Sequence, residues 1–136
     1  MDSSRRHWTV FFFLAAAFNF CMGGPIFFAS AWSYSVAYIL PPDEPTLRFW
    51  GDFGYAVILI GLGYAILGLD VDRNRGIVWL GIVAKLFDMI ALPVRWWEGL
   101  AHPIVLAPAG IDGVFCLGFV WFLIRRPAVN PSPCPR

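Results

Sequence analysis

The sequence has little charge, few cysteines and few histidines. Only 14% of its 136 residues are charged, and the formal net charge is +1. Soluble domains carry roughly a quarter charged residues. Because the net charge is close to zero, no strong positive field exists and we do not expect nucleic acid as a partner. The three cysteines, Cys21, Cys116 and Cys134, lack CxxC or CxxH spacing, which argues against a disulfide framework or a zinc site.

The motifs of common enzyme classes are also missing. The sequence has no nucleophile elbow, P-loop, HExxH or strand-borne GxGxxG pattern. Ser30, Ser33 and Ser35 lack a plausible histidine and acid partner for nucleophilic catalysis. We therefore expect a protein that is not an enzyme, and we predict no cofactor and no metal.

Apolar residues are abundant instead. They make up 59% of the chain, with 7 Trp and 13 Phe among them. A soluble domain of this length could not bury so much apolar surface, whereas a membrane-spanning helix needs about 20 apolar residues. The sequence predicts an all-α membrane protein with a single domain, 1–136, whose four transmembrane helices form an antiparallel bundle. The expected spans are 8–28, 50–69, 76–97 and 104–124.

The segments between and after these spans differ in composition. Arg5 and Arg6 precede the first apolar run, as in a signal peptide, but the run is long and no A-x-A site follows, so we expect an uncleaved span. Gly23-Gly24-Pro25 is expected to kink or end that helix. The Ser- and aromatic-rich segment within 26–45 is expected to extend the first helix or to lie at the interface as an outer loop. The Pro-rich tail, 125–136, cannot form a regular helix.

Arginine is distributed unevenly between the two sides of this layout. One side collects Arg5, Arg6, Arg73, Arg75, Arg125, Arg126 and Arg136. The other side has only Arg48 and Arg95. Basic residues in short segments favour the cytoplasmic side. We therefore predict cytoplasmic N and C termini and a multi-pass protein of the cell inner membrane, with the lipid bilayer as its first partner.

The turn between the second and third spans imitates the opening of a calcium loop. Asp70-x-Asp72-x-Asn74 matches an EF-hand, but Arg75 occupies the glycine position and Gly81 occupies the position of the bidentate glutamate. We interpret the segment as a polar cytoplasmic turn. Asp70 and Asp72 are expected to accept bonds from amides at the start of the third helix, and Asn74 to cap it.

Two charged residues lie within the third span and one in the fourth. Lys85 and Asp88 are three residues apart and share one helical face. At 1.5 Å per residue, Lys85 and Asp88 lie roughly 13 and 18 Å from Gly76, and Asp112 lies roughly 18 Å from Ile124 on the same side. An unpaired charge in hydrocarbon costs about 2.5–3.5 kcal/mol or more, so we expect mutual pairing. We favour a structural ionic latch; proton or ion handling and contact with a polar ligand or partner stay open.

Small residues and histidines give two weaker signals. Gly54, Gly61, Ala65 and Gly68 recur at helical spacing and predict a smooth face for helix contact, within the chain or in an oligomer. His7 and His102 are the only histidines, and both are expected near the interfaces. A bis-histidine haem is therefore not expected, whereas a single axial contact to a chlorophyll-type pigment stays open.

The second and third spans carry a pattern known from a family. A Gly-rich helix leads through Asp70, Asn74 and Arg75 to a Gly-x-x-x-Lys step at Gly81 and Lys85. In this respect the chain resembles small bacterial four-helix membrane proteins of the DoxX-like type, over roughly half of its length. The resemblance implies a four-helix fold, and an Asp near the start of the fourth helix, which Asp112 would match. It implies no particular activity.

Two classes of function follow from these observations. The first is a non-catalytic accessory or structural subunit of a larger membrane complex, respiratory or photosynthetic, with other membrane subunits as partners. The alternative is a small oligomeric transporter or proton- or ion-coupled protein that uses Lys85, Asp88 and Asp112. Bound lipid is expected in either case, and a quinone contact would mark a third class, a membrane redox protein.

Overall fold

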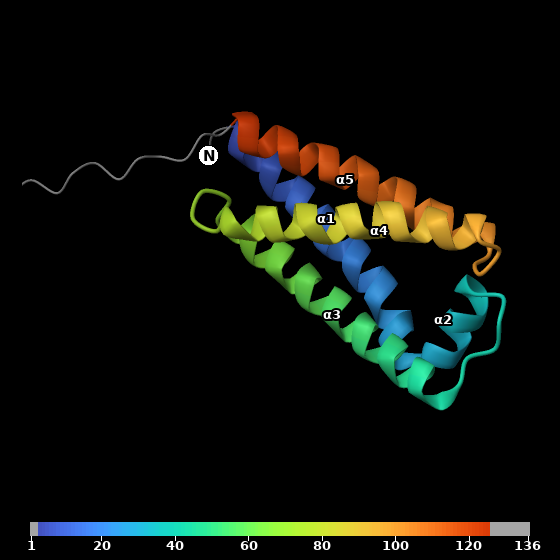
Figure 1. The fold of residues 1–136 in the computed structure, drawn as a ribbon. Coiled ribbons are helices and arrows are strands. Elements are labelled where there is room, and N and C mark those ends of the chain that lie inside the picture. The colour runs from blue at the N-terminus through green and yellow to red at the C-terminus, as the bar shows by residue number, and fades with distance from the viewer. Residues whose placement is uncertain (1–2, 126–136) are drawn as a thin grey trace, which may run out of the picture.

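The fold consists of helices and their connections (Figure 1). The computed structural model describes residues 3–125 and contains no strand within them. Its elements are α1 (Ser3–Phe28), α2 (Ser30–Ala37), α3 (Glu44–Leu69), α4 (Gly76–Trp97), the short 3-10 helix η1 (Pro103–Val105) and α5 (Leu106–Arg125). Four helices, α1, α3, α4 and α5, are long and apolar enough to cross a membrane. The all-α, four-span prediction is confirmed to that extent, and the prediction for the tail beyond residue 125 lies outside the described residues.

Helix α3 begins six residues earlier than the sequence predicted. The carboxylate of Asp43 accepts a hydrogen bond of 2.9 Å from the Thr46 amide, which caps the helix. This bond also holds the pKa of Asp43 below its ordinary value. Glu44 and Arg48 pair one helical turn apart at 2.5 Å. The first turns of α3 are therefore polar but helical.

Pro25 does not end α1, so of the two expected effects of Gly23-Gly24-Pro25, a kink or an end, the second is wrong. The helix continues to Phe28, and the Pro25 carbonyl still accepts the Ala29 amide at 3.0 Å. The break comes at Ala29, whose φ and ψ are −136° and 50°, and α2 follows as a separate helix of 8 residues. The segment expected as an extension or an interfacial piece thus forms the last turn of α1 and then the short helix α2.

The long helices associate as two pairs, α1 with α3 and α4 with α5 (Figure 1). Glycines bring α1 and α3 close together. A Cβ on Gly54 would lie 2.5 Å from the Phe27 nitrogen, and one on Gly61 would lie 3.0 Å from the Asn19 Cβ. Gly68 lies against Phe13 in the same way. This face is therefore occupied by α1 of the same chain, and its suggested use as an oligomer contact is wrong.

The start of α1, the turn at 70–75 and the end of α5 lie at one end of the molecule, here called the arginine-rich end. Arg5 pairs with Asp70 at 3.4 Å and with Asp72 at 3.7 Å. Arg75 donates a hydrogen bond of 3.4 Å to the Leu123 carbonyl. These contacts are partly exposed, so they contribute little energy, but they fix which chain segments meet at this end.

The cap of α4 differs from the expectation. The Asn74 side chain donates to the Asp70 carbonyl at 3.4 Å, and the Asp70 carboxylate accepts the Asp72 amide at 3.3 Å. Arg75 occupies the N-cap position and makes no side-chain cap bond. Asn74 and Asp70 therefore stabilise the turn itself, because both hydrogen bonds lie within residues 70–74, before the helix begins.

The opposite end, here called the outer end, joins α2 to the connection after α4. Gly99 has a φ of +74°, and the Leu100 amide bonds back to the Arg95 carbonyl at 2.9 Å, as in a Schellman C-cap. The Ile39 amide then donates to the Leu100 carbonyl at 3.1 Å, and the His102 amide donates to the Ala37 carbonyl at 2.9 Å. These bonds hold α2 beside the end of α4.

The hydrophobic core occupies the half of the molecule near the arginine-rich end. Aromatic rings dominate it: Phe12 lies 5.7 Å from Phe119 and 5.0 Å from Phe122 between ring centroids. Its buried members are Phe12, Ala15, Ala16, Tyr64, Leu67, Val71, Val78, Ile82, Cys116, Phe119 and Phe122. The half toward the outer end is not filled in this way, and that difference positions the candidate site.

Candidate functional site

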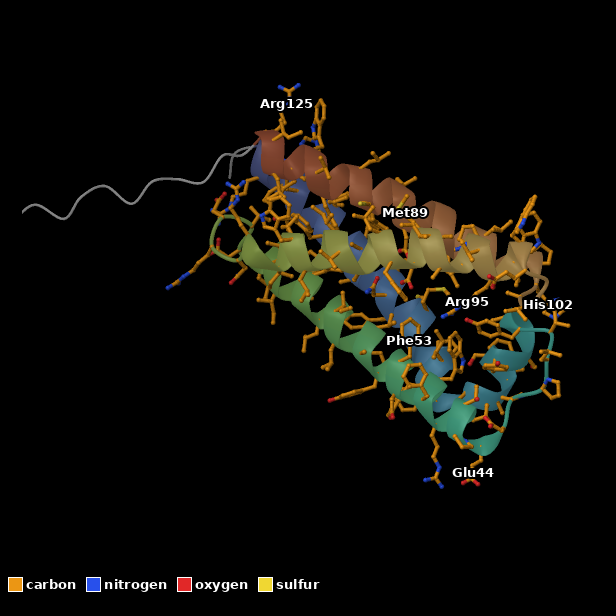
Figure 2. The ribbon with its side chains drawn as sticks, viewed as in Figure 1. Glu44, Phe53, Met89, Arg95, His102 and Arg125 are labelled. Atoms are coloured by element: carbon orange, nitrogen blue, oxygen red, sulfur yellow. The ribbon has the colours of Figure 1, made fainter. Side chains whose placement is uncertain are left out.

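A cavity of about 790 Å³ lies in the half of the molecule toward the outer end. Its wall draws on α1, α2, α3, α4, η1 and α5, and most lining side chains are apolar or aromatic. Figure 2 shows Phe53 and Arg95 pointing into the region between α2, α3 and α4, and both line this cavity. Four charged groups also line it: Lys85, Asp88, Arg95 and Asp112.

Lys85 and Asp112 meet at the inner end of the cavity. The Lys85 ammonium donates a hydrogen bond to the Asp112 carboxylate, and the two residues are only 4% and 5% exposed. The ammonium also donates to the Asn19 side-chain oxygen at 3.1 Å. The Asn19 amide in turn donates to the Val57 carbonyl at 3.4 Å. One polar cluster thus joins α4, α5, α1 and α3.

Aromatic rings surround the Lys85 ammonium. Its nitrogen lies 5.2 Å from the Phe18 ring centroid, 5.6 Å from that of Phe115 and 5.9 Å from that of Tyr64. Ring faces attract a cation within about 6 Å. The ammonium therefore has a carboxylate, an amide oxygen and three rings as partners, and its charge is compensated where it lies.

Asp88 does not join this pair, and the expectation of mutual pairing among all three charges is wrong for this residue. Asp88 is half-buried and lines the cavity one turn further along α4. Within residues 3–125 it makes no ion pair within 4.0 Å. Lys85 and Asp88 do lie on the same side of α4, since both line the cavity. The Lys85 ammonium nevertheless bonds to Asp112 and Asn19, so it does not need Asp88 as a partner.

Arg95 and Tyr38 close the cavity near the outer end. The Arg95 guanidinium donates a hydrogen bond of 2.5 Å to the Tyr38 hydroxyl and lies 5.8 Å from the Tyr38 ring centroid. Burial raises the pKa of the Tyr38 phenol, although the nearby Arg95 charge opposes that rise. On the other side of α2, the Trp50 indole donates to the Ser33 hydroxyl at 3.0 Å. These contacts fasten α2 across the cavity.

Tyr64 adds a buried hydroxyl that the sequence did not single out. Its ring is fully buried, it lines the cavity, and its oxygen has no hydrogen-bond partner within the described part of the chain. Gly81 makes room for it, because a Cβ there would lie 2.6 Å from that oxygen. A buried polar group without a partner costs free energy, so such groups need an explanation. Here the oxygen is itself buried and lies against Gly81 on α4.

Comparison with known proteins identifies no relative of this chain. Comparison of the chain with protein-family models, curated proteins and solved structures gave no match. The resemblance to the DoxX-like type therefore stays a prediction, and the function is argued from the geometry of the cavity.

The two histidines are not brought together. His7 lies near the start of α1 and His102 at the outer end, as Figure 2 shows for His102, and both are exposed. Neither lines the cavity. Contact of a pigment with either histidine stays a prediction, and such a pigment would sit on the outside of the helices.

Proposed function

We propose that this protein binds a small amphiphilic molecule within the membrane, in the cavity between the core and α2. The observation that supports this proposal is the cavity itself. Sites for small molecules enclose about 300–1,000 Å³, are lined mostly by apolar and aromatic side chains, and contain a few polar groups that orient the ligand. A cavity of about 790 Å³ with four charged residues in an apolar wall has these properties.

The polar groups are arranged at different depths, which suits a ligand with a distinct head and body. The Lys85–Asp112–Asn19 cluster lies at the inner end, Asp88 lies along the wall, and Arg95 with Tyr38 lies at the outer end. Protein interiors are normally filled to crystal-like density. A purely structural latch would need no space beside it, so the open cavity favours ligand binding.

The membrane assignment belongs to the same proposal. Four apolar helices support a multi-pass membrane protein. The arginine-rich end gathers Arg5 and Arg75 with the end of α5. By the bias of basic residues toward the cytoplasm, we place this end, with both termini, at the cytoplasmic face of a bacterial inner membrane. The outer end, with α2, then faces away from the cytoplasm.

The experiment compares two tryptophan substitutions on one helix. Ala56 lines the cavity, whereas Leu62 is 50% exposed and does not line it. The full chain would be purified in a mild neutral detergent and examined by native mass spectrometry. We expect a bound small molecule on the wild type and on Leu62→Trp, and its loss from Ala56→Trp. Equal loading of all three proteins, or none of any, would refute binding in the cavity.

The accessory-subunit and transporter predictions stay predictions. A stoichiometric set of co-purifying membrane subunits would support the first. Flux that depends on Lys85 and Asp112 in an intact fold would support the second. Either role is compatible with a ligand in the cavity, since a subunit can hold a lipid and a transporter must hold its substrate.

A further inference from the structure

Asp88 is the charged group of the cavity for which residues 3–125 supply no hydrogen-bond or ion-pair partner. It lies nine residues before the end of α4 at Trp97, which is about 13 Å along the helix axis. Asp88 lines the cavity, and its carboxylate makes no ion pair within 4.0 Å in residues 3–125. A carboxylate without a direct partner at that depth is costly, so a cation from outside the chain would be attracted to it.

The two cations that share α4 with Asp88, Lys85 and Arg95, are engaged elsewhere. Lys85 gives its ammonium to Asp112 and to Asn19, the latter at 3.1 Å. Arg95 gives its guanidinium to the Tyr38 hydroxyl at 2.5 Å and lies over that ring. It also lies seven residues from Asp88 on α4, about 10 Å away along the axis and close to the outer end.

We propose that the ligand is a lipophilic cation, whose positive charge lies against Asp88 and whose apolar body fills the cavity. This inference rests on the proposed function and names the ligand class. Aromatic side chains support it, because Phe18, Trp32, Trp50, Phe53 and Phe87 line the same cavity. Ring faces stabilise a cation in a desolvated site, and they would add to the attraction of the carboxylate.

Asp88 favours a cation, and the other charges of the wall limit where the charged atom of the ligand can lie. Lys85 and Asp112 form a compact pair whose charges cancel at a distance. Arg95 repels a cation, so the charged atom belongs on the inner side of Asp88, away from the outer end. Arg95 would favour an anion instead, and the experiment therefore includes a matched anion.

Two ions of nearly equal size and opposite charge provide the probes: tetraphenylphosphonium and tetraphenylborate. Binding to the purified full chain in neutral detergent would be measured by equilibrium dialysis. The variant is Asp88→Asn, and the matched control is Asp52→Asn, an exposed carboxylate on α3 that does not line the cavity. We expect saturable phosphonium binding to the wild type and to Asp52→Asn. Asp88→Asn should weaken it about tenfold or more, as expected when one contact to a charged group is lost.

The outcomes separate this inference from the proposed function. If both ions bind equally, or the borate binds more tightly, and Ala56→Trp abolishes binding, the cavity holds a ligand but the cation assignment is wrong. The same conclusion follows if Asp88→Asn leaves phosphonium binding unchanged. If neither ion binds and no native ligand depends on Ala56, the proposed function fails as well. Should Asp88→Asn fail to fold, Asp88→Glu must retain phosphonium binding, and the comparison of the two ions on the wild type decides.

Discussion

Lys85 on α4 and Asp112 on α5 form a buried ion pair, and Asn19 on α1 supplies the third contact to the same ammonium. The two helix pairs of the fold, α1 with α3 and α4 with α5, are therefore joined by one polar cluster. The cluster lies between the aromatic core and the cavity. It closes the inner end of the candidate site and links the two halves of the helix arrangement.

Removal of either charge should destabilise the fold. We expect Asp112→Asn to lower the free energy of unfolding by about 3–5 kcal/mol, because it leaves the Lys85 ammonium buried without a carboxylate. Lys85→Met should have a similar effect through the Asp112 carboxylate. Unfolding by SDS titration in mixed micelles measures the change.

Two controls accompany this measurement. The exposed pair Glu44–Arg48 has the same charges at 74% and 78% side-chain exposure, so Arg48→Met should leave unfolding almost unchanged. The double variant Lys85→Met with Asp112→Leu removes both charges and should recover much of the loss, because no unpaired charge remains. A double variant as unstable as the single ones would show that the pair is not the source of the effect.

Asn19→Leu tests the third contact separately. The substitution keeps the side-chain size and removes one hydrogen bond to the Lys85 ammonium and one to the Val57 carbonyl. We expect a loss of about 1.5–3 kcal/mol in the free energy of unfolding, the range for a hydrogen bond to a charged group. Unchanged stability would mean that Asp112 and the aromatic rings are sufficient for Lys85.

The helical rise predicts from the sequence that Lys85, Asp88 and Asp112 lie at comparable depths, but it does not single out Lys85 as the partner of Asp112, because Asp88 is nearer to the depth of Asp112. The helical rise is constant, so two residues at equal distances from the same membrane face can meet. The same count would have found Asn19, the one amide in the first span, about 16 Å from Trp8. An amide carries no formal charge, so the cost of burying it unpaired is smaller and predicts a partner less strongly than for a lysine.

The cavity and the role of α2 could not be predicted from the sequence. Hydrophobic pattern shows that Trp50, Phe53 and Phe87 are apolar, but not that the space between their helices stays open. That depends on how far the helix pairs diverge. The small face of α3 was visible from its spacing, yet the spacing does not name its partner, which is α1. The predicted pairing of Asp88 with Lys85 and Asp112 was wrong for a related reason. Residues on one helical face can direct their side chains toward different partners.

Gly54 provides a sharp test of the contact between α1 and α3. A Cβ at this position would lie 2.5 Å from the Phe27 backbone nitrogen, which cannot move aside as a flexible side chain could. We expect Gly54→Ala to destabilise the fold by about 1–3 kcal/mol, the usual cost of overpacking. Gly51 on the same helix has open space around its Cβ position, so Gly51→Ala should be neutral or stabilise α3 by about 0.5–1 kcal/mol. Equal effects of both substitutions would contradict the close approach.

Tyr38 tests the closure of the cavity by α2. Burial raises the pKa of its phenol above the ordinary value of 10.0, and the Arg95 charge only partly offsets that rise. The folded state then holds the proton more tightly than the unfolded state. Its contribution to stability is therefore present below pH 10 and is lost as the pH rises through the folded pKa.

Phenolate absorbance of the wild type minus that of Tyr38→Phe should show a midpoint above pH 10. Arg95→Met should move this midpoint further upward, because the opposing charge is gone. A midpoint below pH 10 would mean that Arg95 dominates over burial, and that α2 leaves Tyr38 open to water.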